Sequence, residues 1–148
     1  MIDFPKNYFF EKTLKPGKVY YYVSQKTKPP KHRFYIIVTV SDAGTIILCT
    51  TTTQIEKRLK FIKNNKHPNS TLVFIKPDED NGLTEESVVD CNYYDHEDKE
   101  SLKKIFTEKG IRLKGNIKDS KLEEIRKGLI DSPLVEEEIK NIVKKDMI

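Results

Sequence analysis

Runs of apolar residues, either alternating with polar ones or continuous over a few positions, predict β-strands along most of the chain. These runs lie at 18–24, 34–40, 45–51, 70–77, 86–94 and 110–117. The second and third runs are separated by Ser-Asp-Ala-Gly, in which Asp42 and Gly44 suit a tight turn. We therefore expect these two strands to pair as an antiparallel hairpin.

Apolar residues spaced three or four apart predict helices between and after the strands. A helix over about 54–64 is expected because Thr53 and Glu56 have the spacing of a capping box. Another is expected over about 97–109, ending at Gly110. Two further stripes follow, the second with Pro133 in its first turn: Leu122, Ile125 and Leu129, then Val135, Ile139, Ile142 and Val143. The predicted fold class is α+β, mainly β, a small antiparallel barrel or curled sheet with inserted helices and a helical C-terminal end.

Length and composition indicate one globular domain covering residues 1–148. Hydrophobic residues make up 36% of the chain and charged residues 34%, which is typical of a folded protein with a highly charged surface. No apolar run approaches the eighteen or so residues of a membrane span, and the first residues lack the pattern of a secretory signal. We therefore expect a cytoplasmic protein without membrane contact, in which Cys49 and Cys91 are reduced core residues.

The charge is divided unevenly along the chain. Residues 1–70 contain 13 Lys and Arg against 4 acidic residues, whereas residues 71–148 contain 14 against 19. The most concentrated positive segment is the loop 24–33, which Pro29 and Pro30 hold extended. A surface built from the basic half would attract a polyanion such as RNA or DNA. The alternative is a solvated, lysine-rich face without a partner.

Several kinds of site are not indicated by the sequence. No Cys and His spacing suggests zinc, and the acidic cluster 78–80 lacks the ligand spacing of a calcium loop, so a solvated turn is expected there. The chain has neither a phosphate-binding glycine loop nor the glycine-flanked serine of a nucleophile elbow. We expect neither a metal nor a cofactor.

An ordered set of short motifs resembles the MazF/PemK (Kid) family of toxins. The set comprises Pro-Gly-Lys-Val-Tyr, His-Arg opening a strand, a strand ending in Thr-Thr-Gln, Gly-Leu ahead of Ser-Val-Val, and Leu-Lys-Gly-Asn-Ile before Leu122, Glu124, Ile125 and Arg126. The match covers most of the chain in the right order. The resemblance implies an SH3-like barrel, a homodimer, a neutralising antitoxin partner and cleavage of single-stranded RNA without a metal.

The resemblance also implies which residues act on RNA. The arginine that opens the second strand and the threonine that ends the third are tied to catalysis in this family, and Arg33 and Thr52 occupy those places. A guanidinium suits the paired oxygens of a phosphate better than an ammonium does. Strand alternation sends Thr50 and Thr52 to one side and Thr51 to the other, and Thr51 is the second choice. The alternatives are a surface arginine and a threonine run that serves strand propensity alone.

Further residues are candidates for binding RNA around this site. His32 is also a candidate proton shuttle, because imidazole titrates near neutral pH. Four tyrosines could stack bases or pack in the core: Tyr20, Tyr21, Tyr22 and Tyr35. The expected RNA contacts are Lys26, Lys28, Lys31, His32, Thr53, Lys57 and Arg58.

The chain departs from the family in three segments and in one loop. The extra length falls in 54–68, in the helix at 97–109 and in the final helix, and the loop before the arginine is rich in proline and lysine. Two alternative functions therefore stay open. One is a non-catalytic toxin like the gyrase-poisoning CcdB group, and the other is a plain SH3-like module that binds nucleic acid or protein.

Overall fold

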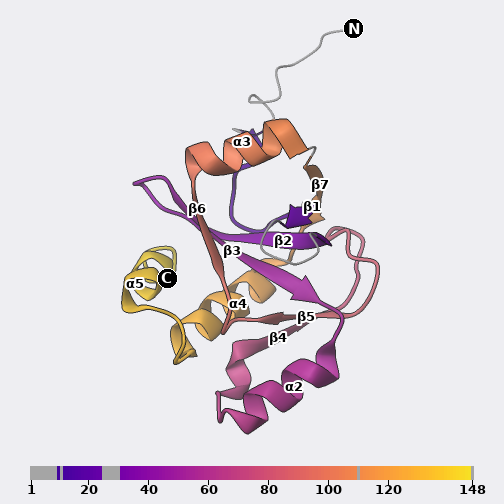
Figure 1. The fold of residues 1–148 in the computed structure, drawn as a ribbon, viewed down its shortest axis with the longest axis vertical. Helices are drawn as coiled ribbons and strands as arrows, with labels where there is room; N and C mark the ends of the chain where they lie inside the picture. The colour runs from indigo at the N-terminus through magenta and orange to yellow at the C-terminus, as the bar shows by residue number, and fades with distance from the viewer. Residues whose placement is uncertain (1–9, 11, 25–30, 110, 148) are drawn as a thin grey trace, which may run out of the picture.

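The computed structural model describes residues 10, 12–24, 31–109 and 111–147 of the chain. Helices are inserted between groups of strands, and the last two helices form the C-terminal end (Figure 1). In chain order the elements are β1 (Lys18–Ser24), β2 (Lys31–Val40), β3 (Thr45–Thr52), α2 (Ile55–Asn64), the 3-10 helix η1 (Asn69–Thr71), β4 (Leu72–Ile75), β5 (Ser87–Asp90), β6 (Asp95–Asp98), α3 (Lys99–Lys109), β7 (Arg112–Asn116), α4 (Asp119–Asp131) and α5 (Glu137–Lys144). None of the helices in these ranges is long and apolar enough to cross a membrane.

The strands form one seven-stranded sheet in which every paired strand is antiparallel. Its order is β4-β5-β3-β2-β1-β7, and β6 also pairs with β3. Strand β3 therefore has β2 on one edge and two short strands on the other, β6 along its first half and β5 at Thr51 and Thr52. The predicted hairpin of β2 and β3 is confirmed, as is the prediction of a mainly β fold with a helical C-terminal end.

The two ends of the sheet are joined through the loop that follows β4. The backbone N–H of Asn116, the last residue of β7, donates to the carbonyl oxygen of Asp80 at 2.8 Å. Gly82 adopts a φ of +69° and lies so close to β7 that an added Cβ would be 2.4 Å from the Lys114 carbonyl oxygen. The loop at 76–86 thus bridges the first and last strands of the order, and the curled sheet is barrel-like.

Both faces of the central strands are buried, each under different helices. One core cluster contains Ile36 and Val38 of β2 together with Ile125 of α4 and Val143 of α5. The alternate residue Ile37 belongs to a second cluster, which includes Leu102 of α3 (Figure 1 shows α3 and the C-terminal helices on opposite sides of β2 and β3). Because β2 is covered on both faces, its sequence is a continuous apolar run rather than an alternating one.

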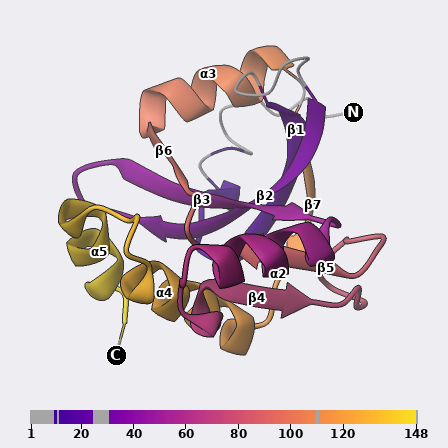
Figure 2. The ribbon, with the colours of Figure 1, turned by 60° about the horizontal axis from the view of Figure 1, so that its bottom comes forward.

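Helix α2 packs beside β4 and β5 (Figure 2). Its Ile62 is buried with Leu72 of β4 and Val88 of β5. The predicted capping box at Thr53 does not form, because Gln54 is the N-cap and no side chain caps the helix. The side chain of Thr52 contacts the start of the helix instead. Its Oγ1 accepts a hydrogen bond from the Gln54 backbone N–H at 3.2 Å.

The segment predicted as one strand at 86–94 and as a helix start at 97 is divided differently. Strand β5 ends at Asp90, a turn follows in which the Tyr93 backbone N–H donates to the Asp90 carbonyl oxygen at 3.1 Å, and β6 begins at Asp95. Strand β6 has the sequence Asp-His-Glu-Asp and carries no apolar alternation, so the sequence pattern gave no sign of it. Pro133 likewise lies before α5 rather than in its first turn, because α5 begins at Glu137.

Candidate active site

Arg33 and Thr52 lie on neighbouring strands at the same end of the β2–β3 ladder. Tyr35 of β2 pairs with Thr50 of β3. Arg33 lies two residues before Tyr35, and Thr52 lies two residues after Thr50, so the antiparallel register places them opposite one another. Both residues are partly exposed. Together they line two adjoining hollows of about 270 Å³ and 300 Å³, which we call the first and second hollow.

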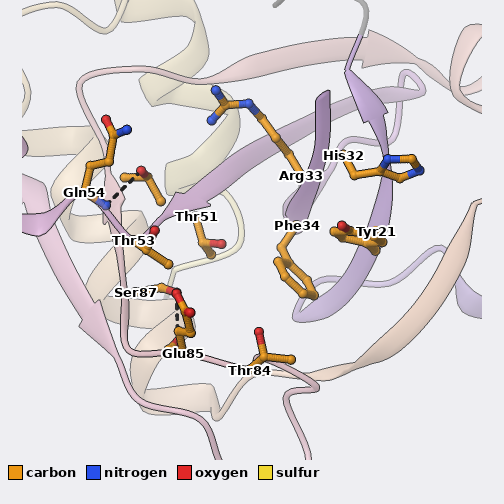
Figure 3. A pocket seen from close by; sticks show the side chains of 11 residues that line it. Tyr21, His32, Arg33, Phe34, Thr51, Thr53, Gln54, Thr84, Glu85 and Ser87 are labelled. Carbon is orange, nitrogen blue, oxygen red and sulfur yellow. Dashed lines mark hydrogen bonds between the residues drawn. The ribbon is translucent and has the colours of Figure 1, made fainter. Parts of the chain in front are cut away.

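Aromatic side chains form one side of the first hollow (Figure 3). The rings of Tyr21 and His32 are stacked with centroids 5.1 Å apart, and the ring of Phe34 lies 4.7 Å from that of Tyr21. The ammonium of Lys114 is placed over the Tyr21 ring, 5.6 Å from its centroid. Of the four candidate tyrosines, only Tyr21 lines this hollow, and the other three are buried in the core: Tyr20, Tyr22 and Tyr35.

Threonine side chains face the aromatic rings across the first hollow, as Figure 3 shows for Thr51 and Thr53. Thr51 is 6% exposed and pairs with Val89 of β5, whereas Thr53 is exposed beyond the strand end. Thr50 lines only the second hollow. Thr52 is the one member of the run that lines both.

The guanidinium of Arg33 carries an unsatisfied donor. Its Nε is buried and has no hydrogen-bond partner in the part of the chain that the structure describes. In Figure 3 the side chain extends away from the His32 ring. A buried guanidinium N–H without an acceptor costs free energy.

Two further groups in the first hollow come from the loop before β5. The side chains of Thr84 and Glu85 line the hollow on the side opposite Arg33 (Figure 3). The hydroxyl of Ser87 donates to the Glu85 carbonyl oxygen at 3.0 Å and holds this loop against the start of β5. Glu85 thus adds a carboxylate to the lining of the first hollow, which also contains the His32 imidazole.

The second hollow is lined by Arg33, Thr50, Thr52, Arg58, Asp90 and Tyr93. Asp90 and Tyr93 were not among the residues that the sequence singled out. They lie at the two ends of the turn between β5 and β6, and the sequence pattern had placed both in one continuous strand. The signal that could have located them was Asn92 between them, because Asn and Asp favour turns.

The expected RNA contacts are distributed unevenly around the two hollows. His32 and Thr53 line the first hollow, and Arg58 lines the second. Lys57 is exposed on α2 and lines neither. The remaining three lysines cannot be placed: Lys26 and Lys28 lie outside the described residues, as does the side chain of Lys31.

Other predicted features of the surface and core also have a defined place. The cluster 78–80 forms a turn in which Asp78 Oδ1 accepts from the backbone N–H groups of Asp80 and Asn81, both at 2.8 Å. Cys49 and Cys91 are buried as free thiols, which confirms them as core residues. Within the described ranges, no group of three or more His, Cys, Asp or Glu side chains could hold a metal ion.

Comparisons with known proteins give a likeness in structure and none in sequence. No protein-family model matches the chain, and no curated protein matches it in sequence. A chain from the crystal structure of MazE-MazF (Form-III) from Deinococcus radiodurans superposes with a TM-score of 0.49 and 14% identity. The superposition covers 79% of this chain and 92% of that one.

Proposed function

We propose that this protein cleaves single-stranded RNA without a metal ion. The observation that carries the proposal is that Arg33 and Thr52 line the same two hollows. A phosphodiester oxygen is an acceptor that suits the planar fork of a guanidinium. The motif resemblance, which singles out these same two residues, supports the proposal independently of their geometry.

The side chains of the first hollow match the needs of cleavage by the ribose 2′-OH. In that reaction the 2′-oxygen attacks the adjacent phosphorus, the 5′-oxygen leaves, and a cyclic phosphate and a 5′-hydroxyl are formed. Arg33 would stabilise the charge that develops on the phosphate oxygens, and the Thr52 hydroxyl would hold one of them. His32 and Glu85 also line the first hollow and are candidates to accept the proton from the 2′-OH and to protonate the leaving oxygen.

The aromatic side of the first hollow favours unpaired RNA as the substrate. The stacked rings of Tyr21 and His32 offer a flat surface on which an unstacked base can lie. A base in a duplex is already stacked on its neighbours and cannot reach such a surface. Cations around the hollow, Arg33 above all, would then hold the backbone beside the stacked base.

The cellular role that we propose is that of a toxin which an antitoxin protein holds in check. This part of the proposal follows from the motif resemblance. The same resemblance supports two further proposals, that the chain forms a homodimer and that residues 1–148 act as a single domain. Its test is expression in a host cell: growth should stop, and growth should resume when the neighbouring gene is expressed with it. Growth arrest that persists in Arg33→Ala without RNA breakage would favour a non-catalytic toxin instead.

The direct test is cleavage of mixed-sequence single-stranded RNA in the presence of EDTA. The purified protein should produce fragments with 5′-hydroxyl ends, and Arg33→Ala should abolish them. Lys63→Ala is the matched control, because Lys63 is exposed on α2 and lines neither hollow. If several such RNAs stay intact with the wild-type protein, the proposed activity is wrong.

A further inference from the structure

Arg58 is the cation of α2 that faces the second hollow. Its side chain is 26% exposed. The other three cations of the same helix are exposed to solvent: Lys57, Lys60 and Lys63. Two contacts fix its guanidinium at the hollow. A terminal nitrogen lies 3.6 Å from Asp90 Oδ2, and Cζ lies 5.4 Å from the centroid of the Tyr93 ring.

Asp90 is itself held by a buried polar network. Its Oδ1 accepts hydrogen bonds from the backbone N–H and the side-chain Nδ2 of Asn92, at 3.0 Å and 2.8 Å. Asn92 Nδ2 also donates to Thr71 Oγ1 at 3.0 Å, and the hydroxyl of Ser132, at the end of α4, donates to Asn92 Oδ1 at 2.7 Å. The carboxylate therefore has a fixed orientation, and it presents Oδ2 to Arg58.

The contact between Arg58 and Asp90 orients the guanidinium without using its donors. At 3.6 Å the two atoms attract by charge, but they are too far apart for a good hydrogen bond. Asp90 Oδ2 likewise makes no hydrogen bond within the described part of the chain. A guanidinium has five N–H donors in a planar fork, so Arg58 keeps donors for a molecule in the hollow.

The lining of the second hollow favours an anion with several oxygen atoms. Two guanidinium groups, Arg33 and Arg58, and the hydroxyls of Thr50 and Thr52 surround it, against the single carboxylate of Asp90. Its volume of about 300 Å³ is ample for a phosphate group with part of its sugar. Because Arg33 and Thr52 also line the first hollow, an anion bound in the second hollow would adjoin one bound in the first.

We propose that the second hollow binds the RNA phosphate next to the one that is cleaved, with Arg58 as its contact and Asp90 as the residue that positions Arg58. The inference rests on the proposed function, since it assigns a second phosphate of the same substrate. The competing occupant is a nucleobase on the Tyr93 ring, which is 48% exposed. Phosphate is favoured because two guanidinium groups line the hollow.

Charge removal from single phosphates of the substrate tests the proposal. After the cleavage site of a short RNA has been mapped, each flanking phosphate is replaced in turn by an uncharged methylphosphonate, and kcat/KM is measured. With the wild-type protein, one position beside the cleavage site should lose roughly 10-fold or more, as expected for a hydrogen bond to a charged group. In Arg58→Gln the native RNA should lose a similar factor, and the penalty at that position should disappear.

Two further variants separate the contact from its support. Asp90→Asn keeps an oxygen that can accept a hydrogen bond from Asn92 but removes the charge that orients Arg58. In this variant the methylphosphonate at the same position should cause a smaller loss of kcat/KM. The native RNA should show a raised KM, with kcat near the wild-type value. Lys60→Gln removes an exposed charge from the same helix and should leave the positional pattern unchanged.

The possible outcomes separate this inference from the proposed function. If the wild-type protein leaves RNA intact, both proposals are wrong. If the RNA is cut but the methylphosphonate pattern is the same in Arg58→Gln, the second phosphate subsite alone is rejected. A substrate that lacks one base beside the cleavage site gives the last outcome. If the wild-type protein loses kcat/KM when that base is removed, but not when a phosphate charge is removed, the hollow binds a nucleobase and the proposal is wrong.

Discussion

The hydroxyl oxygen of Thr52 accepts a hydrogen bond from the backbone N–H of Gln54, 3.2 Å away. The bond fixes the oxygen at the point where β3 ends and α2 begins, between the two hollows. Because the hydroxyl acts as acceptor toward Gln54, its own hydrogen stays available to donate. An oxygen of a bound phosphate is the acceptor that we expect for it.

Replacing Thr52 by Val should slow RNA cleavage by roughly 10-fold or more, since Val keeps the shape of the side chain and removes the donor. Thr52→Ser should retain most of the rate. The free energy of unfolding should fall by only about 1 kcal/mol in Thr52→Val, because one partly exposed hydrogen bond is lost, and Thr52→Ser keeps the oxygen that accepts it. Cleavage rates and urea unfolding measure the two effects. A Thr52→Val protein that cuts as fast as wild type would transfer the role to another hydroxyl, and Thr51→Val would then be the slow variant.

Gly82→Ala should destabilise the protein by about 2 kcal/mol or more, because it combines a left-handed backbone with a clash. An added Cβ would lie 2.4 Å from the Lys114 carbonyl oxygen and would push the loop away from β7. Gly44→Ala is the matched control: its φ is +90°, and the nearest atom lies 4.0 Å from the added Cβ, so only the backbone cost of about 1 kcal/mol applies. Equal losses in the two variants, measured by denaturant unfolding, would contradict the bridging role of the loop.

The stability of the fold should decrease as the pH rises from about 10 to about 12. Burial raises the pKa of Tyr20 from 10.0 to about 12, although its hydrogen bond to Thr13 acts in the opposite direction. The raised pKa means that the neutral phenol stabilises the folded state fully below pH 10. Above pH 10 the phenol of Tyr20 ionises in the unfolded chain but not yet in the folded one. The contribution of Tyr20 to the free energy of unfolding is therefore lost as the pH rises to about 12.

Alkaline unfolding of Tyr20→Phe tests this assignment. The variant cannot ionise at this position, so its stability should depend less steeply on pH between 10 and 12 than that of the wild type. Some slope should remain, because burial also raises the pKa of Tyr22. Identical slopes in the two proteins would show that Tyr20 does not contribute.

The thiols of Cys49 and Cys91 should be unreactive in the folded protein. Both are buried, and burial raises the pKa of each thiol well above its usual value, with nearby negative charge adding to the effect. The thiolate is the reactive form, so DTNB at pH 8 should not modify the native protein. In guanidinium chloride both thiols should react. Rapid reaction of the native protein would contradict their burial.

Much of the fold could be predicted from the pattern of apolar residues. The continuous run of β2 indicated a strand, and the structure adds the reason for its composition, since Ile36 and Ile37 are buried on opposite faces. Strand β6 could not be found in this way. Its charged residues pair with β3 through the backbone, which carries no sequence signal, and its pairing depends on where the preceding turn directs the chain.

The candidate site was predictable where residues adjacent in sequence are also adjacent in the fold. His32 and Arg33 lie near the start of β2, and Thr51 and Thr52 end β3, so the hairpin alone brings them together. Asp90 and Tyr93 reach the second hollow only because a turn breaks the apolar segment at 86–94. The capping pattern at Thr53 and Glu56 was misleading, because the N-cap is Gln54 and the helix begins one residue later than the pattern predicts.

The hydrogen bond from Ser132 to Asn92 links the end of α4 to the second hollow, which Ser132 itself does not line. A truncation or fusion that displaces Ser132 would remove its hydrogen bond to Asn92. The orientation of the Asp90 carboxylate, which Asn92 holds, would then change as well. If the second hollow binds the proposed phosphate, the end of α4 belongs to the scaffold that sets its affinity, and that affinity can change without any alteration in the lining residues.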